Sequence, residues 1–200
     1  MKQEHFDAVI QYFVEEYRLT TAVSRHRIFS RIGRESAVRF LKWLALRRFL
    51  RKYTVDPRKD PEHICDLLKS ALKNPDAKEA EAANLLGWKF GFPRSCLVPL
   101  NTLLTEDWHE VHEDLAMALG DLRDPSSIDP LCRAALMDLD YLAYDQACAL
   151  AAKCCYALGA INTEEAIEKL RALAQSENPA KAAAAKRQLR HQKHPPNRMT

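Results

Sequence analysis

Residues 119–158 read LGDLRDPSSIDPLCRAALMDLDYLAYDQACALAAKCCYAL, and this segment carries the clearest sign of a repeated structural unit. It opens with a Leu-Gly step, passes through a turn and enters a fresh apolar pattern. The step occurs three times, with spacings of 33 and 39 residues: Leu86-Gly87, Leu119-Gly120 and Leu158-Gly159. Glycine is favoured at helix C-termini, and self-similarity at such a period is typical of repeat proteins. The sequence therefore predicts a helical repeat in which each Leu-Gly step ends a helix.

Proline marks the other helix boundaries. An Asp or Asn precedes proline at four of the predicted helix starts: Asp60-Pro61, Asn74-Pro75, Asp124-Pro125 and Asn178-Pro179. Asp and Asn cap helix N-termini, and proline in the first turn loses no needed hydrogen bond. Asn162 and Glu165 add a capping-box pattern. The predicted helix pairs are 61–73 with 76–90, 94–104 with 107–122, 125–137 with 140–160, and 163–175 with 178–191.

Composition and apolar spacing predict an all-α fold. Ala, Leu, Glu, Lys and Arg, which favour helices, dominate the chain, and only 5 glycines occur. The predicted second helix of the third pair carries one apolar stripe, made of Ala147, Leu150, Ala151, Cys154 and Leu158. A single pair cannot bury such a stripe, so successive pairs must stack. We therefore predict an α-helical solenoid.

The quoted stretch resembles the HEAT-like repeats of the phycobilisome-lyase type, and the resemblance covers residues 60–191. It implies a right-handed α-α superhelix of four helix pairs. It also suggests lyase activity on bilin chromophores, for which the sequence offers no specific residues. The chain lacks the Val-Arg pair that is usual at the start of the second helix in this repeat type. We therefore do not transfer the lyase function with the fold.

Residues 1–59 and 192–200 fall outside the repeats. The first segment is expected to be an N-terminal basic helical cap, because terminal repeats are usually atypical. Its predicted helices span 3–18, 21–32 and 34–53, with Gly33 ending the second. The last segment contains Pro195-Pro196 and is expected to be a disordered tail.

Six cysteines occur without any Cys-x-x-Cys motif: Cys65, Cys96, Cys132, Cys148, Cys154 and Cys155. The chain has enough apolar residues to fold without a disulfide framework, so we expect all six to be reduced core residues. The N-terminus lacks a secretory pattern, and no apolar run approaches the roughly 20 residues that span a bilayer. We therefore expect a soluble cytoplasmic protein with no cofactor, no metal and no membrane partner.

Charge is segregated along the chain. Residues 18–59 hold 13 Lys/Arg against 2 Asp/Glu, a net of +11, whereas residues 60–200 hold 16 against 21, a net of −5. Second helices of such repeats generally line the concave side, which predicts an acidic groove there. Acidic and aromatic side chains suit a basic protein or peptide. The predicted partner-binding residues are Glu79, Trp88, Glu106, Trp108, Glu110, Glu113, Asp114, Tyr141, Tyr144 and Asp145. The alternative is that the carboxylates solvate an outer face and the aromatics belong to the core.

The basic N-terminal segment supports a second interpretation. Its cations alternate with aromatic residues, a pattern found where proteins bind phosphates. The candidate nucleic-acid-binding residues are Arg39, Lys42, Arg47, Arg48 and Arg51. The alternative is a solvated face that pairs with nearby acidic residues.

Two enzymatic hypotheses are weaker. His109-Glu110 and His112-Glu113 contain metal-ligand residue types, but both dipeptides are expected on one helix, whereas a metal site needs ligands from several elements. HEAT-like DNA glycosylases use aromatics and an aspartate in a basic groove, and Tyr141 lies one turn before Asp145. An acidic groove would instead repel a phosphate backbone.

The leading hypothesis is a non-enzymatic protein-binding module with an acidic concave groove. A bacterial adaptor, or an immunity protein that neutralises a basic toxin domain, would have this size and composition. The alternative is a nucleic-acid-binding protein, DNA-glycosylase-like, that uses the basic N-terminal helices.

Overall fold

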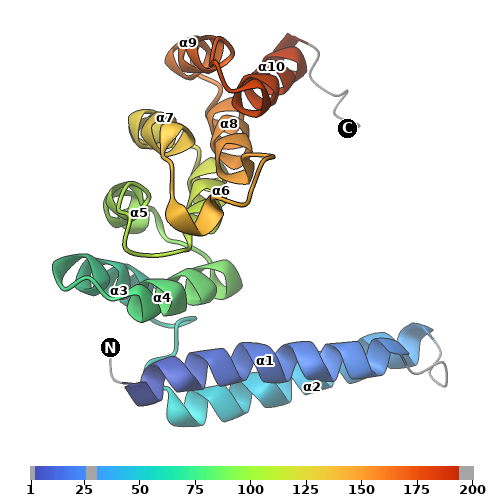
Figure 1. Ribbon diagram of the computed structural model, residues 1–200. Coiled ribbons are helices and arrows are strands. Elements are labelled where there is room, and N and C mark those ends of the chain that lie inside the picture. Colours follow the sequence, from blue (N-terminus) through green and yellow to red (C-terminus); the bar gives the residue numbers. More distant parts are fainter. Residues whose placement is uncertain (1–2, 26–30, 194–200) are drawn as a thin grey trace.

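The computed structural model describes residues 3–25 and 31–193, and within these ranges every regular element is a helix. The chain begins with two long antiparallel helices, α1 (Gln3–Arg25) and α2 (Arg31–Lys52). Together they form a hairpin that lies across the N-terminal end of the helices that follow (Figure 1). Of the disordered tail predicted for 192–200, residues 192 and 193 instead belong to the last helix, and the rest lies outside the described residues.

The hairpin corrects the predicted three-helix cap. The break between helices that was expected near residue 20 is absent, and α1 continues to Arg25. Within α1 the Thr20 hydroxyl donates to the Glu16 carbonyl 2.9 Å away. Threonine can satisfy its hydroxyl in this way without leaving a helix. Gly33 lies inside α2 rather than at a helix end. Residues 26–30 of the predicted second helix lie outside the described residues.

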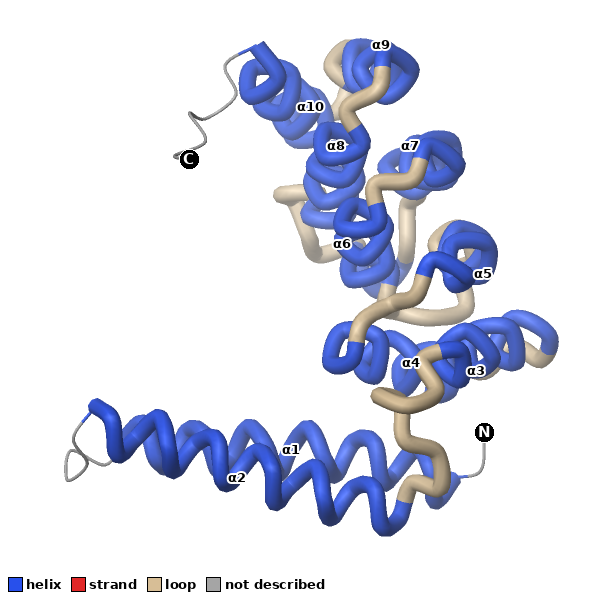
Figure 2. The backbone as a smooth tube through the Cα atoms, turned by 180° about the vertical axis from the view of Figure 1, so that it is seen from behind, coloured by secondary structure: helices blue, strands red, loops and turns tan. Residues whose placement is uncertain are grey.

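Four helix pairs follow the hairpin, and we call them the repeat body. They are α3 (Glu62–Lys73) with α4 (Ala77–Phe90), α5 (Leu97–Leu103) with α6 (His112–Leu122), α7 (Ile128–Leu136) with α8 (Ala149–Ile161), and α9 (Glu164–Leu173) with α10 (Pro179–Lys193). Short 3-10 turns span Arg94–Cys96, Pro125–Ser127 and Asp140–Leu142. First helices line one side of the stack and second helices the other (Figures 1 and 2). The predicted all-α solenoid is confirmed.

The second helices of the two middle pairs are shorter than predicted. The predicted helix at 107–122 begins only at His112, and the one at 140–160 begins only at Ala149. The Asp145 carboxylate accepts hydrogen bonds from the backbone N–H groups of Ala147 and Ala149, at 3.0 and 2.5 Å, and Cys148 adopts a left-handed φ of 52°. These local bonds compete with the helix. Each middle pair therefore contains a long loop between its two helices.

Two of the five predicted helix N-caps are present in the structure. Asp124 and Asn178 accept hydrogen bonds from backbone N–H groups at the starts of the helices after them. Elsewhere the cap is shifted: Asp76 caps α4 in place of Asn74, and Thr163 caps α9 in place of Asn162. Asn162 instead ends α8 with a φ of 54°. Before α3, Pro61 provides no side-chain cap.

The Leu-Gly steps do not end the helices, which continue for two or three residues beyond the glycine. Their role is close packing. A Cβ on Gly120 would lie 3.0 Å from Ala157 Cα of α8, and one on Gly87 would overlap the Phe92 ring. Only glycine allows such approaches. Gly120 therefore allows close packing against the next helix pair, and Gly87 allows close packing against the segment that follows its own helix.

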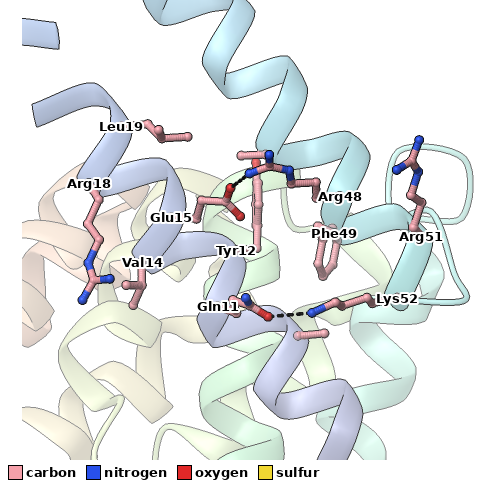
Figure 3. A pocket seen from close by; sticks show the side chains of 12 residues that line it. Gln11, Tyr12, Val14, Glu15, Arg18, Leu19, Arg48, Phe49, Arg51 and Lys52 are labelled. Atoms are coloured by element: carbon pink, nitrogen blue, oxygen red, sulfur yellow. Dashed lines mark hydrogen bonds and ion pairs between the residues drawn. The ribbon is translucent and has the colours of Figure 1, made fainter. Parts of the chain in front are cut away.

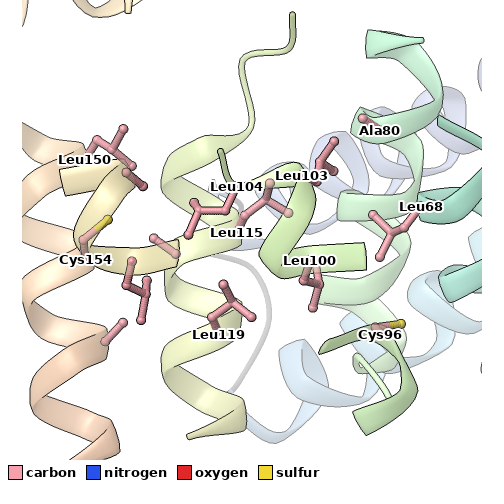
Figure 4. Packing of buried hydrophobic residues seen from close by; sticks show 14 of the residues in the cluster. Leu68, Ala80, Cys96, Leu100, Leu103, Leu104, Leu115, Leu119, Leu150 and Cys154 are labelled. Atoms are coloured by element: carbon pink, nitrogen blue, oxygen red, sulfur yellow. The ribbon is translucent and has the colours of Figure 1, made fainter. Parts of the chain in front are cut away.

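The repeat body has a continuous leucine- and alanine-rich core. Figure 4 shows leucines of α5 and α6, including Leu100, Leu103 and Leu115, packed between Leu68 of α3 and Leu150 of α8. All of these except Leu150 are fully buried. Each helix pair thus buries its apolar stripe against its neighbours, as the stacking argument requires.

Cys65 and Cys96 form a disulfide, which overturns the expectation that all six cysteines are reduced. Cys65 lies in α3 and Cys96 at the start of the next first helix, with their Cα atoms 4.9 Å apart. Stacking brings equivalent positions of successive pairs side by side, so two cysteines 31 residues apart become neighbours. The other four remain free thiols. Cysteine usage therefore gives no support to the predicted reducing compartment.

Candidate functional site

The loops inside the second and third pairs meet to form an acidic pocket. Its volume is about 310 Å³, and we call it the loop pocket. Four exposed carboxylates surround it, together with two half-buried aromatic side chains: Asp107, Glu110, Asp138, Asp140, Trp108 and Tyr141. His109 and Leu139 complete the lining. The first loop joins α5 to α6, and the second joins α7 to α8.

A pair of buried histidines holds the first loop against the repeat body. The ring nitrogen Nε2 of His109 lies 2.7 Å from the Leu103 carbonyl oxygen, and its Nδ1 accepts a hydrogen bond from the Val111 N–H at 3.2 Å. This pattern requires a neutral ring with its proton on Nε2. Burial lowers the pKa of His109 to about 4. Near neutral pH the His109 side chain is therefore uncharged and stabilises the loop through these hydrogen bonds.

His112 connects the two loops. Its Nε2 lies 2.6 Å from the Glu106 carbonyl oxygen and therefore donates, which leaves Nδ1 to accept from the Tyr141 hydroxyl at 2.9 Å. Its ring stacks on His109 with centroids 4.1 Å apart. Burial lowers the pKa of His112 and raises that of Tyr141 to about 12, so both groups stay neutral. The hydrogen bond from Tyr141 to His112 therefore fixes this aromatic side chain of the loop pocket in place.

The predicted metal-type cluster is arranged differently from the expectation. His109-Glu110 lies in the loop and only His112-Glu113 lies on α6, so the two dipeptides do not share a helix. Both imidazoles are used in the hydrogen bonds just described, two of which go to backbone carbonyls. In the part of the chain that the structure describes, no three His, Cys, Asp or Glu side chains are grouped so as to hold a metal ion.

The structure brings together some of the predicted partner-binding residues. Trp108, Glu110 and Tyr141 line the loop pocket, and Glu106 lies behind it, where its carboxylate accepts from the Trp108 indole N–H at 3.1 Å. Tyr144, with 82% of its surface exposed, lies further along the second loop. These residues lie on loops, not on second helices as the sequence suggested.

The remaining predicted residues lie elsewhere. Trp88 is 43% exposed on α4, and Asp145 is committed to capping its own loop. Glu113 pairs with Lys153 of α8, and Asp114 accepts a hydrogen bond from the Asn84 amide. Glu79 is buried and accepts from the Ser70 hydroxyl.

Sequence reasoning missed three of the four pocket carboxylates. Asp107, Asp138 and Asp140 were not among the candidate residues. The Asp-Leu-Asp pattern around Leu139, with its apolar residue buried between two exposed acids, is the signal that could have found two of them. It was overlooked because the second loop was expected to be much shorter.

The candidate nucleic-acid residues all lie on α2, but they are not equally free. Lys42 approaches Glu16 at 3.7 Å, and Arg48 pairs with Glu15. Arg47 lies over the Trp43 ring, 5.3 Å from its centroid. Arg39 and Arg51 are exposed and make no ion pair with any residue that the structure describes. Part of the predicted patch therefore holds the hairpin together.

Comparison with protein families identifies the repeat. A model of the PBS lyase HEAT-like repeat matches residues 111–137, which contain α6, the turn after it and α7. The chain is a HEAT-like helical-repeat protein. No curated protein and no solved structure matches it. Helical repeats of this architecture use their extended surfaces for binding, which makes the chain a protein-interaction module. None of its described helices is long and apolar enough to cross a membrane.

Proposed function

We propose that this HEAT-like protein binds a basic partner protein and that the loop pocket receives an arginine or lysine side chain of that partner. The observation that carries the proposal is the lining of the pocket. Asp107, Glu110 and Asp140 have no ion-pair partner among the described residues, and only Asp138 approaches a cation, Lys181, at 3.6 Å. Such unpaired carboxylates favour a cationic ligand through electrostatic attraction.

The aromatic walls support a guanidinium in particular. Trp108 and Tyr141 offer ring faces over which a cation is attracted, and the flat guanidinium can stack on a ring while it donates to a carboxylate. The pocket's volume of about 310 Å³ suits one long side chain. The histidine network fixes the two loops before binding, so little ordering entropy remains to be lost.

This proposal includes the two biological roles suggested by the sequence. An immunity protein that blocks a basic toxin domain and an adaptor that holds a basic client both need an acidic recognition surface. Either role involves no chemistry at the pocket. The partner would determine which role applies.

The test uses a fluorescently labelled peptide that carries a single arginine between neutral residues, compared with the same peptide carrying citrulline. We expect the arginine peptide to bind and the neutral analogue to bind at least about tenfold more weakly. Glu110→Lys with Asp140→Lys should abolish the difference. The matched control, Glu165→Lys with Glu168→Lys, makes the same charge change at exposed positions of α9. Equal loss in both variants, or equal binding of both peptides, would contradict the pocket proposal.

A pull-down from nuclease-treated host lysate then identifies the partner. A basic protein that is retained by the wild type and the α9 control, but lost by the pocket variant, is the expected result. Recovery that is unaffected by the pocket substitutions would reject the proposal even if a protein were captured.

Nucleic-acid binding is the second candidate function, and the specific observation in its favour is an exposed aromatic pair. Phe40 and Trp43 stack on α2 with 59% and 50% of their surfaces exposed, and Arg47 lies over Trp43. Bases of single-stranded nucleic acids stack on such side chains. A uridine oligomer that binds with steep salt dependence, and that loses affinity on Trp43→Ala, would support this function. Salt-independent or absent binding would exclude it.

A further inference from the structure

An apolar groove runs along the hairpin between α1 and α2. It encloses about 540 Å³. Its apolar residues come from both helices: Ala8, Tyr12, Val14, Leu19, Ala45 and Phe49. Figure 3 shows the Tyr12 and Phe49 rings between the two helices, and their centroids are 4.9 Å apart. Ala8, Tyr12, Ala45 and Phe49 are buried and form the floor of the groove, whereas Val14, which is 43% exposed, and the half-buried Leu19 supply its accessible apolar surface. A concave surface with such a lining can receive the apolar face of an amphipathic helix.

The rim of the groove is positively charged. Arg18, Arg48, Arg51 and Lys52 stand against a single carboxylate, Glu15. Arg48 pairs with Glu15, and the Lys52 ammonium donates to the Gln11 side chain at 2.9 Å (Figure 3). Neither Arg18 nor Arg51 has an acidic partner among the residues that the structure describes. The rim therefore keeps a net charge of about +3 by formal count.

The groove does not face the repeat body. Gln3 and Phe6 of α1 lie near the Lys78 ammonium of α4, and Glu16 and Tyr12 lie near the Lys89 ammonium. Of these four side chains only Tyr12 also lines the groove, at its floor, where it is 3% exposed. The rim residues Arg18, Arg51 and Lys52 remain exposed, so the repeat body leaves the mouth of the groove uncovered.

We propose that this groove receives an acidic amphipathic helix of a partner protein, which would turn the two-helix hairpin into a three-helix bundle. The apolar face of such a helix would cover the floor, and its carboxylates would meet Arg18 and Arg51. Helix-in-groove recognition combines these two features. The proposal is independent of the loop pocket, whose charge has the opposite sign.

Other occupants fit less well. A second copy of the hairpin would bring two rims of like charge together, which opposes pairing. The C-terminal segment of the chain is itself basic, since residues 186–200 contain five Lys/Arg and no Asp/Glu. A nucleic acid would satisfy the rim through its phosphates but would leave the apolar floor without a matching surface.

The probe is a labelled peptide of about 18 residues, long enough to form a helix on binding, with leucine at one face and glutamate elsewhere. A matched peptide replaces every glutamate by lysine. In fluorescence anisotropy with the full-length protein, we expect the glutamate peptide to bind at least about tenfold more tightly than the lysine peptide. Added salt should weaken the complex without abolishing it, because apolar contact persists.

Variants locate the contact. Arg18→Glu with Arg51→Glu reverses two exposed rim charges without touching the floor, and should weaken the glutamate peptide at least about tenfold. Arg133→Glu with Lys186→Glu makes the same charge change on α7 and α10 and serves as the control. Methyl resonances of Ala8, Leu19 and Ala45 should shift when the peptide is added, which tests the floor without any substitution. Circular dichroism checks that both variants are folded.

Five results would overturn the proposal. Equal affinity for the two peptides would show that charge does not select the ligand. An equal loss in rim and control variants would show that only net charge matters. Peptide binding that leaves the groove methyls unchanged would place the contact elsewhere. Displacement of the labelled peptide by a uridine oligomer, at a lower concentration than the unlabelled peptide needs, would assign the rim to nucleic acid. Self-association in sedimentation equilibrium that the rim substitutions abolish would assign the groove to a second copy of the chain.

Discussion

The repeat body and the α1–α2 hairpin are stabilised in different ways. The largest fully buried side chains all lie between residues 64 and 170, and none of them belongs to the hairpin. The hairpin instead exposes much of its apolar surface, including Val14, Tyr17, Phe40 and Trp43. Each inner pair of the body is covered by neighbours on both sides, whereas the hairpin has a neighbour on one side only.

This difference shows where binding surfaces can exist. A buried leucine is fully used by folding, but an exposed apolar or unpaired charged side chain is available to a partner. On its helices the body exposes single apolar side chains such as Trp88 and Val98, and its long loops bring aromatic side chains and unpaired carboxylates together in the loop pocket. The hairpin offers exposed apolar and cationic side chains along its length. If the comparison is right, substitutions in the body core should reduce stability strongly, and those that release the hairpin should reduce it little.

The largest effect is expected for Leu119→Ala. Leu119 is fully buried in α6, and its truncation removes apolar contacts and leaves a cavity. We expect a loss of about 4 kcal/mol in the free energy of unfolding, measured by urea denaturation. Val14→Ala, at a 43% exposed position of the hairpin, is the control and should cost less than about 1 kcal/mol. Similar losses for the two variants would show that the body and the hairpin are stabilised in the same way.

Removal of the Cys65–Cys96 disulfide should have the next largest effect. It closes a loop across a sequence separation of 31 residues, which restricts the unfolded chain and contributes about 3 kcal/mol. We expect reductant to lower the urea midpoint of the wild type by a corresponding amount. The variant Cys65→Ala with Cys96→Ala should be insensitive to reductant. A wild type equally stable in both conditions would show that the bond does not constrain the body.

Much of the fold could be predicted from the sequence because its signals are local. The Leu-Gly steps and the Asp/Asn-Pro boundaries define four helix pairs, and those pairs are present. The Cys65–Cys96 bond could not be predicted in the same way, because it depends on how neighbouring pairs stack. The hairpin was divided wrongly at Gly33, since the preference of a single residue does not decide a helix that tertiary contacts support.

The candidate site was predicted in part. Aromatic and acidic residues were recognised at Trp108, Glu110 and Tyr141, and these now share one pocket. Their elements were wrong, because Asp145 and the histidines stop the helices early through contacts with backbone groups. Asp138 and Asp140 were not predicted to line a pocket, because the predicted helices left only a short connection there. In the structure the loop runs from the end of α7 at Leu136 to the start of α8 at Ala149.

Acid should destabilise the body through His109. In the unfolded chain the pKa of histidine is about 6.5, whereas in the folded protein that of His109 is about 4. Between these values the unfolded state binds a proton that the folded state does not, so stability is complete above about pH 6.5 and falls as the pH drops towards 4. Between about pH 7.5 and pH 5 this amounts to about 2 kcal/mol.

The measurement compares urea denaturation of wild type and His109→Gln at these two pH values. The variant is less stable throughout, because it loses the bond to the Leu103 carbonyl, but its pH-dependent loss should be smaller by about 2 kcal/mol. His191→Asn, at an exposed position of α10, is the control substitution. An identical pH dependence in wild type and His109→Gln would show that this histidine is not the sensitive group.

The smallest effect is expected at the junction of hairpin and body. Lys89 of α4 donates to both carboxylate oxygens of Glu16 in α1, at 2.5 and 2.6 Å, and Glu16 is only 8% exposed. Lys89→Met should cost about 1 kcal/mol, since Lys42 at 3.7 Å still compensates part of the carboxylate's charge. The loss should be local: amide hydrogen exchange should accelerate in α1 and α2, while exchange in α6 and α8 stays unchanged. Uniform acceleration would mean that hairpin and body unfold as one unit, and the hairpin would then be a fully integrated end of the solenoid rather than a separately held surface.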